Sequence, residues 1–382
     1  MAKHKENQEE VRRAPVQFAA IDSYVETNIV APTEKKLPGR DMVEWGDANL
    51  YPQYVRGLFA DVTTLHTIIE GNVDFVGGNQ VVLNVPDDAP HFAGGIMNKK
   101  GVSIRDQVRD CAFDLNILGG FALQVIRDRS GAVAELYAVP VDFLRSNADN
   151  TVFYYSEKWD KRGPKDVIVL PAYMKDLDWA TLSDEEKNRH ASSIYYVKTT
   201  RRGTYPAPKF AAAVKACETE RCIDDYHLNA INNGFEGSMI VNFNNGLANE
   251  QQQEEIEEDF NEKFSGHQNA GRIAFSWNPN KDSQTTITVP PIKDFGERYR
   301  ALADHCRQQI FCAFRAVPSL FGLPTASGFS QEEYESAFKL YNRTQIQPMQ
   351  RTIIEAYEYV LGPGVLTIVP FSLGGENEDN IQ

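Results

Sequence analysis

The sequence predicts an α+β protein that is divided into several units, and three observations support this class. Strand-like runs cluster in the first half around a charged turn at residues 127–131. Two long helical repeats occupy the second half. A short β-α-β pattern separates these two repeats. Strands that gather in one part of the chain predict an α+β domain there, with mostly antiparallel pairing.

Residues 1–40 are expected to form an N-terminal arm. Lys and Glu are interleaved in this segment, and Pro15, Pro32 and Pro38 would interrupt any helix. A segment of this kind is predicted to be flexible, or to be ordered only by a partner.

The first half after the arm predicts two helices and a hairpin. Apolar residues recur at helical spacing over residues 49–77 and predict one helix that stops at Gly77-Gly78. A second amphipathic helix is predicted over residues 104–117. The runs 121–126 and 132–139 flank the charged turn and predict a β-hairpin. Further strands are expected at residues 80–84, 152–155, 167–170 and 194–197.

The second half begins with a long predicted helix over residues 209–233. Another long helix is predicted over residues 294–316, with charged residues on its outer side. Two prolines and two glycines make residues 317–330 a loop, and residues 331–361 resume as a helix that Pro348 is expected to kink. The compact unit between the first two helices is predicted to hold strands at 238–243, 272–277 and 285–289 and an acidic helix at 249–264.

Length and composition narrow the function. The 382 residues, 43.0 kDa in mass, predict two to three domains. Lys and Arg number 39 against 53 Asp and Glu, and the net charge of −14 predicts weak non-specific binding to nucleic acid phosphates. No window approaches twenty uninterrupted apolar residues, so neither a membrane span nor a secreted precursor is expected.

No catalytic or nucleotide-binding motif stands out. The chain has no G-x-x-x-x-G-K-[ST], no G-x-G-x-x-G after a strand and no H-E-x-x-H. The acidic run at 250–262 lacks the glycine and the alternating acid spacing of a calcium loop. The residues alone therefore favour a structural or interaction protein over an enzyme.

The five cysteines are odd in number and lack any C-x-x-C spacing, which predicts reduced thiols. A metal site is conceivable only if two helices pack together and join His305, Cys306 and Cys312 to a second group, Cys217, Cys222 and His227. Cysteine at an apolar helix position is more often a small core side chain, so no metal and no cofactor are expected. A thiol-dependent enzyme that uses Cys306 or Cys312 with His305 remains an alternative.

Several runs of the second half follow each other in a characteristic order. A β-α-β insertion that ends in residues 269–273 (Asn-Ala-Gly-Arg-Ile) leads through a long helix to 314–322 (Phe-Arg-Ala-Val-Pro-Ser-Leu-Phe-Gly). Residues 328–333 (Gly-Phe-Ser-Gln-Glu-Glu) and Gln347-Pro348 come next. This order resembles the portal proteins of tailed bacteriophages, in the HK97-like branch, over residues 45–361. The charged turn before residues 136–140 is similar to the family's wing, whereas Ser319 stands where the family usually has a second proline.

The resemblance implies a portal fold and its division of the chain. The parts would be an N-terminal arm (1–40), a wing (41–206), a first stem helix (207–235), a clip (236–292), a second stem helix (293–316), a tunnel loop (317–330), a long kinked helix (331–361) and a short C-terminal segment (362–382) with a reduced crown.

The resemblance also implies a non-enzymatic homo-oligomeric ring, usually a dodecamer in this family, at one capsid vertex of the virion after assembly in the host cytoplasm. Double-stranded DNA would pass through it without sequence specificity during packaging and ejection. The clip would meet the terminase large subunit and then the head–tail adaptor, and the wing would meet the major capsid and scaffold proteins. No membrane partner is expected. The alternative within the virion is another head–tail connector or adaptor protein.

Three groups of residues would make these contacts if the resemblance holds. The tunnel loop would approach DNA through Pro318, Gly322, Pro324, Thr325, Ala326, Ser327, Gly328 and Phe329. Four stem arginines would face the channel or pair with a neighbouring subunit, namely Arg298, Arg300, Arg307 and Arg315. The clip would present an acidic surface to terminase and adaptor, made of Glu250, Glu254, Glu255, Glu257, Glu258 and Asp259.

Overall fold

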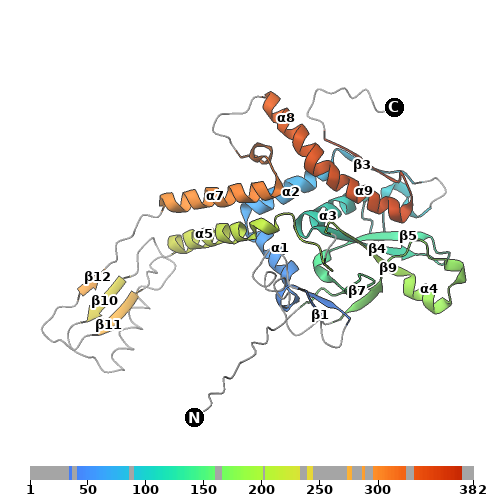
Figure 1. The fold of residues 1–382 in the computed structure, drawn as a ribbon, viewed down its shortest axis with the longest axis horizontal. Helices are drawn as coiled ribbons and strands as arrows, with labels where there is room; N and C mark the ends of the chain where they lie inside the picture. Colours follow the sequence, from blue (N-terminus) through green and yellow to red (C-terminus); the bar gives the residue numbers. More distant parts are fainter. Residues whose placement is uncertain are drawn as a thin grey trace, which may run out of the picture.

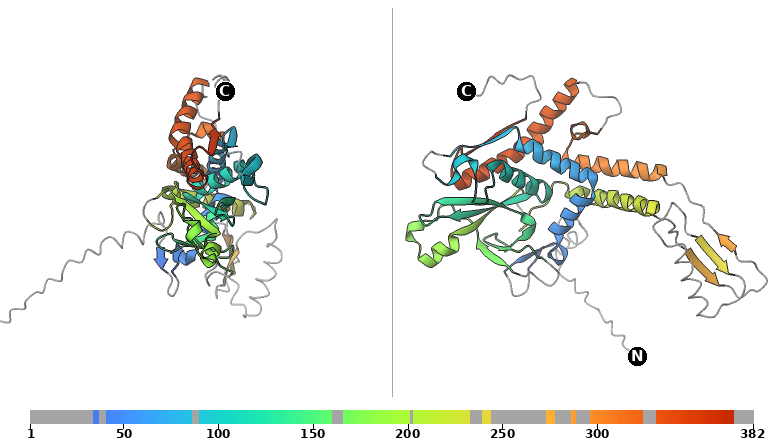
Figure 2. Two further views of the ribbon diagram at one scale, coloured as in Figure 1. Left: turned by 90° about the vertical axis from the view of Figure 1, so that its right-hand side faces the viewer. Right: turned by 180° about the vertical axis from the view of Figure 1, so that it is seen from behind.

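The computed structural model describes residues 34–36, 41–85, 90–159, 166–200, 203–232, 239–243, 273–277, 286–288, 296–323 and 331–371. Two long helices, α5 (Val214–Asn232) and α7 (Gly296–Phe314), run side by side and project from a body of helices and strands (Figure 1). A small three-stranded sheet lies at their far end, and Figure 2 shows the same arrangement from behind. The fold therefore separates a packed body from a projecting helix pair.

The single helix expected at 49–77 is two helices, α1 (Tyr51–Asp61) and α2 (Thr63–Gly77). Between them Val62 is fully buried and adopts an extended backbone with φ −106° and ψ 105°. The carboxylate of Glu220 on α5 accepts hydrogen bonds from the Thr64 hydroxyl at 2.7 Å and the Thr64 amide at 3.4 Å, where α2 begins. The prediction was wrong because a residue distant in sequence supplies a partner for the exposed first turn of α2.

The predicted hairpin is confirmed as β4 (Gly120–Arg127) and β5 (Val133–Val139). Strand β9 (Ser192–Lys198) pairs with the other edge of β4, so the antiparallel order is β5-β4-β9. In the turn, the Asp128 carboxylate accepts hydrogen bonds from the amides of Ser130 and Ala132, at 2.8 and 3.1 Å. The short acid thus closes the loop that the alternating strands require.

A second sheet has five antiparallel strands in the order β1-β2-β6-β7-β8. An isolated parallel bridge between Ala172 and Ile194 joins this sheet to β9 of the first sheet. Sequence analysis predicted β7 and β8 within one residue but did not predict the other three strands, which have three residues each. The bounds are β1 Glu34–Lys36, β2 Val43–Trp45, β6 Leu144–Ser146, β7 Val152–Tyr155 and β8 Ile168–Pro171.

Helix α3 (Ile104–Ile117) packs against α2, β4 and α9 (Gln347–Leu361). Its N-terminus is capped by Ser103, whose hydroxyl accepts a hydrogen bond from the Asp106 amide at 3.2 Å. Strand β3 (Gln80–Leu83) pairs with β13 (Leu366–Val369), a strand that sequence analysis did not predict. The short helix α4 (Asp184–His190) was also missed, although Ser183 and Glu186 form a capping box before it.

The long helix predicted over 331–361 is interrupted, as expected, but the interruption comes before the proline. Helix α8 (Gln331–Tyr341) passes into a π-helical turn (Asn342–Ile346), and α9 then begins at Gln347. Pro348 occupies the first turn of α9, where a proline is tolerated. Its missing amide removes a donor for the preceding turn, which accounts for the irregular turn there.

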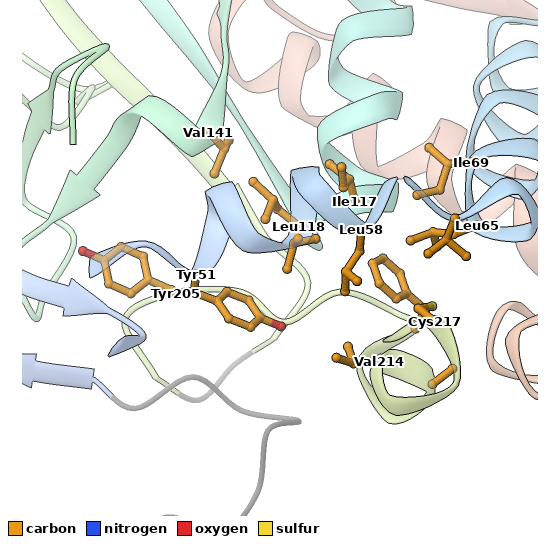
Figure 3. Packing of buried hydrophobic residues seen from close by; sticks show 14 of the residues in the cluster. Tyr51, Leu58, Leu65, Ile69, Ile117, Leu118, Val141, Tyr205, Val214 and Cys217 are labelled. Atoms are coloured by element: carbon orange, nitrogen blue, oxygen red, sulfur yellow. The ribbon is translucent and has the colours of Figure 1, made fainter. Parts of the chain in front are cut away.

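Two hydrophobic clusters form the core. The first joins α1, α2, α5 and α7, and Figure 3 shows Leu58 and Leu65 turned toward Val214 and Cys217 of α5. The second lies under α3, α9 and the hairpin, and includes Val108, Leu123 and Tyr357. Phe321 packs against both clusters and therefore connects them.

Arg145 of β6 is fully buried and holds several segments together. Its Nε and Nη2 atoms donate hydrogen bonds of 2.6 Å to the side-chain and backbone oxygens of Asn49. Nη1 donates to the carbonyls of Asp142 and Leu144, at 2.9 and 2.7 Å. The guanidinium carbon lies 4.7 Å from the Trp159 ring centroid. Burial lowers the pKa of Arg145 to about 10, so the group remains charged at neutral pH.

We expect Arg145→Lys to destabilise the protein by about 2–4 kcal/mol, because an ammonium group cannot span both oxygens of Asn49 and lies less well against an indole ring. Urea unfolding followed by tryptophan fluorescence measures this loss. The same exchange at exposed Arg129 is the control and should change the midpoint little. Equal midpoints for the two variants would contradict the structural role of Arg145.

Asp114 of α3 is a buried carboxyl whose Oδ2 atom accepts a hydrogen bond of 2.9 Å from the Val141 amide. Burial raises the pKa of Asp114 to about 8, and the charge on nearby Asp142 adds to this effect. The unfolded chain would release this proton near pH 4, so the folded state binds more protons between about pH 4 and pH 8. Stability from this group is therefore fully present at low pH and is lost as the pH rises toward 8.

We expect the wild-type protein to lose up to about 1.4 kcal/mol of unfolding free energy per pH unit between about pH 4 and pH 8 because of this carboxyl. Asp114→Asn keeps an oxygen for the Val141 amide and should remove that slope. Thermal melts from pH 5 to pH 9 compare the two proteins. Asp149→Asn, at an exposed position, is the control and should follow the wild type.

Candidate functional site

The projecting helices α5 and α7 are antiparallel and pack along their length. Near the body, the rings of Phe210 and Phe314 stack with centroids 5.5 Å apart. Toward the far end, Tyr226 of α5 lies 4.9 Å from the ring of Tyr299 on α7. Between these contacts Cys217 and Cys306 are both buried. Apolar side chains at helical spacing therefore join the pair into one unit.

Polar contacts fix α5 where it meets the body. The Tyr54 hydroxyl donates a hydrogen bond of 2.7 Å to Glu218, and Arg221 lies 3.7 Å from the carboxylate of Asp61. Glu220 accepts from Thr64, as described above. Together with the buried Phe210 and Val214, these contacts set the direction in which the helix pair leaves the body.

Part of the apolar surface of the helix pair remains uncovered in the single chain. Tyr226 and Leu228 of α5 are 48% and 57% exposed, and Leu302 of α7 is 40% exposed. Large apolar side chains that gather on projecting helices are typical of surfaces that another protein covers.

The four predicted arginines do not gather in one place. Arg300 and Arg307 follow Asp304 along one side of α7, at positions four and three residues apart, and Arg307 pairs with Asp304 at 3.0 Å. Arg315 follows the helix with a left-handed backbone, φ 53°, and is exposed. Arg298 lies in α7, and its side chain is outside the described residues.

The segment after α7 begins with packed structure rather than as an open loop. Residues Pro318–Phe321 form a short 3-10 helix in which Leu320 is buried. The Phe321 ring has its centroid 6.0 Å from Phe75, 5.9 Å from Phe311 and 5.8 Å from Tyr341. Gly322 then adopts a left-handed backbone, φ 79°, which glycine accepts without strain.

Pro318 and Gly322 are thus the predicted loop residues that the structure describes, and both are exposed. Pro324, Thr325, Ala326, Ser327, Gly328 and Phe329 lie outside the described residues.

A close contact on α2 positions the start of this segment. A methyl group built on Gly71 would lie 2.7 Å from a ring carbon of Phe321, far inside van der Waals contact. Beside it, the Tyr341 hydroxyl donates a hydrogen bond of 2.6 Å to Asn72, whose amide donates to Asn116 at 3.0 Å. Sequence analysis missed these residues, because a glycine and an asparagine within a helical pattern give no sign of a distant partner.

The small sheet beyond the helix pair confirms the predicted strands of the compact unit. Strand β10 (Met239–Phe243) pairs in parallel with β11 (Ile273–Trp277) and antiparallel with β12 (Thr286–Thr288). The predicted helix at 249–264 lies outside the described residues, and so do the six acids assigned to the clip surface: Glu250, Glu254, Glu255, Glu257, Glu258 and Asp259.

The thiols of the helix pair lack the features of a nucleophile. Burial raises the pKa of Cys217 to about 12, and burial also raises the pKa of Cys306. Cys222 and Cys312 are exposed and so face away from the buried pair. Within the described ranges, no group of three His, Cys, Asp or Glu side chains is placed to hold a metal ion. None of the described helices is long and apolar enough to cross a membrane.

A protein-family model described as phage portal protein matches residues 101–372, which is more than half of the sequence. The chain belongs to the phage portal protein family. It is therefore a structural channel protein of the phage particle and not an enzyme, so the thiol-dependent alternative is set aside. Comparison with curated protein sequences gives no significant match.

Solved structures share the fold of this portal protein at low sequence identity. A chain in the virion of a native gene transfer agent particle aligns with a TM-score of 0.53 and 15% identity, over 89% of this chain and 86% of that one. A chain in the neck of the native particle, with C12 symmetry, aligns with a TM-score of 0.51 and 14% identity, over 94% and 90%. An HK97 family phage portal protein from Corynebacterium diphtheriae aligns with a TM-score of 0.46 and 10% identity, over 79% and 88%.

We expect Gly71→Ala to destabilise this portal protein by about 1–3 kcal/mol, because the added methyl group displaces the Phe321 ring from its packed site. Gly57→Ala in α1 is the matched control, since nothing lies within 4 Å of a methyl group there. That control should be neutral or gain about 0.5–1 kcal/mol from helix propensity. Thermal melts compare the variants, and a stabilised Gly71→Ala protein would contradict the close contact.

Proposed function

We propose that this portal protein assembles into a closed dodecameric ring and that its projecting helix pair forms the stem around a DNA channel. Residues 207–235 and 293–316 would be the stem and 236–292 the clip. Residues 41–206 would be the wing, 317–330 the tunnel loop, 331–361 the long kinked helix and 362–382 a reduced crown. The C12 symmetry of the similar neck chain supports the subunit number.

The observation that carries this proposal is the uncovered apolar surface on both helices of the projecting pair. A ring that closes by rotation needs two different surfaces on each subunit that fit each other. Tyr226 and Leu228 supply exposed apolar atoms on α5, and Leu302 supplies them on α7. The stem of one copy can therefore bury its α5 residues against the α7 residue of the next.

The charge distribution supports passage of DNA rather than tight binding. The net charge of −14 disfavours the phosphate contacts that would hold a duplex in place. Arg307 is already paired with Asp304, so its positive charge is partly balanced. Arg298, Arg300 and Arg315 are proposed to face the channel or to pair with acids of the adjacent copy. The tunnel loop would approach DNA beyond Gly322, at residues 324–329.

The remaining partners follow from the proposed position of each part. The clip, with Glu250, Glu254, Glu255, Glu257, Glu258 and Asp259, would meet the terminase large subunit during packaging and the head–tail adaptor afterwards. The wing would meet major capsid and scaffold proteins. Assembly would take place in the host cytoplasm before the portal enters the virion.

Assembly is tested by light-scattering mass together with negative-stain imaging. A dodecamer has a mass of about 516 kDa, twelve times the 43.0 kDa of one chain, and should show a central hole. Leu228→Glu with Leu302→Glu should shift the protein to single chains, whereas Met174→Glu, at an exposed apolar position outside the stem, should not. Rings that survive the double substitution would contradict the stem interface.

Terminase binding is tested by a pull-down of the terminase large subunit on assembled rings. Deletion of residues 246–268 should abolish capture without changing the ring mass. Capture that persists after the deletion would show that the clip is not the terminase surface.

A further inference from the structure

Strand β8 is an edge strand with uncovered apolar side chains. Among the described strands it pairs only with β7, apart from the single bridge at Ala172. Ile168 is 56% exposed and Val169 is 59% exposed, although they are neighbours on opposite faces of the strand. Proteins usually protect such an edge with charges, a bulge or a covering segment, because it can otherwise pair with a strand of another protein. No charged residue lies between Ile168 and Pro171.

A cavity of about 250 Å³ opens beside this edge. Ile168 and Leu170 of β8 form one wall, opposite Val139 and Pro140 at the end of β5. Tyr155, directly across from Ile168 in the sheet, also lines the cavity. Val169 pairs with Tyr154 and so points to the other face. A strand added along β8 would therefore place every second side chain at the cavity.

The N-terminal arm starts from the same sheet. Strand β1 begins at Glu34 and lies at the edge opposite β8, four strand spacings or about 19 Å away. The 33 residues before Glu34 can span about 100 Å when extended. The first strand is also firmly held, because the Glu34 carboxylate accepts hydrogen bonds from the amides of Thr204 and Tyr205, at 2.9 and 3.0 Å. The arm therefore starts from a fixed point within reach of β8.

One part of the arm has the pattern of a strand. Residues 24–30 read Tyr-Val-Glu-Thr-Asn-Ile-Val, so that β-branched side chains alternate at Val25, Thr27 and Ile29. β-branched and aromatic residues favour strands, and alternate positions share one face.

Charge also matches this segment to β8. Residues 14–33 contain Asp22 and Glu26 and no Lys, Arg or His. Lys100 lines the cavity, with its ammonium group 5.8 Å from the Tyr137 ring, and Lys158 is exposed just after β7. An acidic strand can lie here without like-charge repulsion.

We propose that residues 24–30 of the N-terminal arm bind along β8 as an added strand, with Val25, Thr27 and Ile29 directed toward the cavity. This docking covers Ile168 and Val169 and satisfies the outer backbone groups of β8. It does not depend on ring formation, because the arm is long enough to reach the β8 strand of its own chain as well as that of a neighbouring copy.

Hydrogen exchange on the full chain tests the docking. Val25→Asp with Ile29→Asp should make the amides of residues 168–170 exchange at least about tenfold faster, because a carboxylate cannot enter the apolar cavity. Val11→Asp with Val16→Asp changes the same arm outside the segment and should leave this exchange unchanged. A free peptide of residues 20–31 should restore protection to the Val25→Asp, Ile29→Asp protein.

Two outcomes would overturn the proposal. In the first, β8 exchanges equally fast in the wild-type protein and in the Val25→Asp, Ile29→Asp protein. In the second, β8 gains protection only when capsid or scaffold protein is added, which would identify a different occupant. Measurement on single chains and on rings separates this test from that of the proposed assembly.

A disulfide cross-link locates the docked arm. Val25→Cys with Val169→Cys, in a protein whose exposed Cys222 and Cys312 are replaced by Ser, should oxidise readily. A link within one chain or a covalent dimer on a non-reducing gel shows which copy supplies the arm. Absence of both products, with Val11→Cys and Val169→Cys as the comparison, would also contradict the docking.

Discussion

The helix pair α5 and α7 is held by the packing at its root, where Phe210, Val214 and Phe314 enter the first hydrophobic cluster. Beyond that point the two helices contact mainly each other, so the direction of the whole projection depends on a few buried residues. Glu220 strengthens the same place by accepting hydrogen bonds from the start of α2. Phe321 adds the segment after α7 to this root, because its ring lies against Phe311 and against α2.

Buried polar groups complement this apolar packing in the body. Arg145 links Asn49 to β6, and Asn72 links Tyr341 to Asn116. Each of these groups has partners, and each joins segments that are far apart in the sequence. Buried and satisfied polar groups specify one arrangement more strictly than apolar contacts do, because a displaced partner leaves a donor or acceptor without a hydrogen bond.

The local elements could be predicted wherever one segment alone determines them. The hairpin β4–β5 was found because strand alternation and the turn at Gly131 lie within twenty residues. The break at Val62 was not found, because Glu220 on a distant helix takes part in it. The start of the tunnel loop was expected to be open, yet Leu320 and Phe321 pack on residues of α2 and α8. Three-residue strands such as β2 and β6 have too little periodicity to be recognised.

The length of the helix pair has a mechanical consequence. Helix α5 has 19 residues and is about 28 Å long, and it is fixed at one end only. It therefore acts as a lever with its pivot beside Phe210 and Phe314. A tilt of about 10° at the pivot would move the small sheet at the other end by about 5 Å, from the same helix length. Because Phe321 contacts the pivot, a load applied to the distant sheet reaches the base of the tunnel loop without any intervening contact along the shaft.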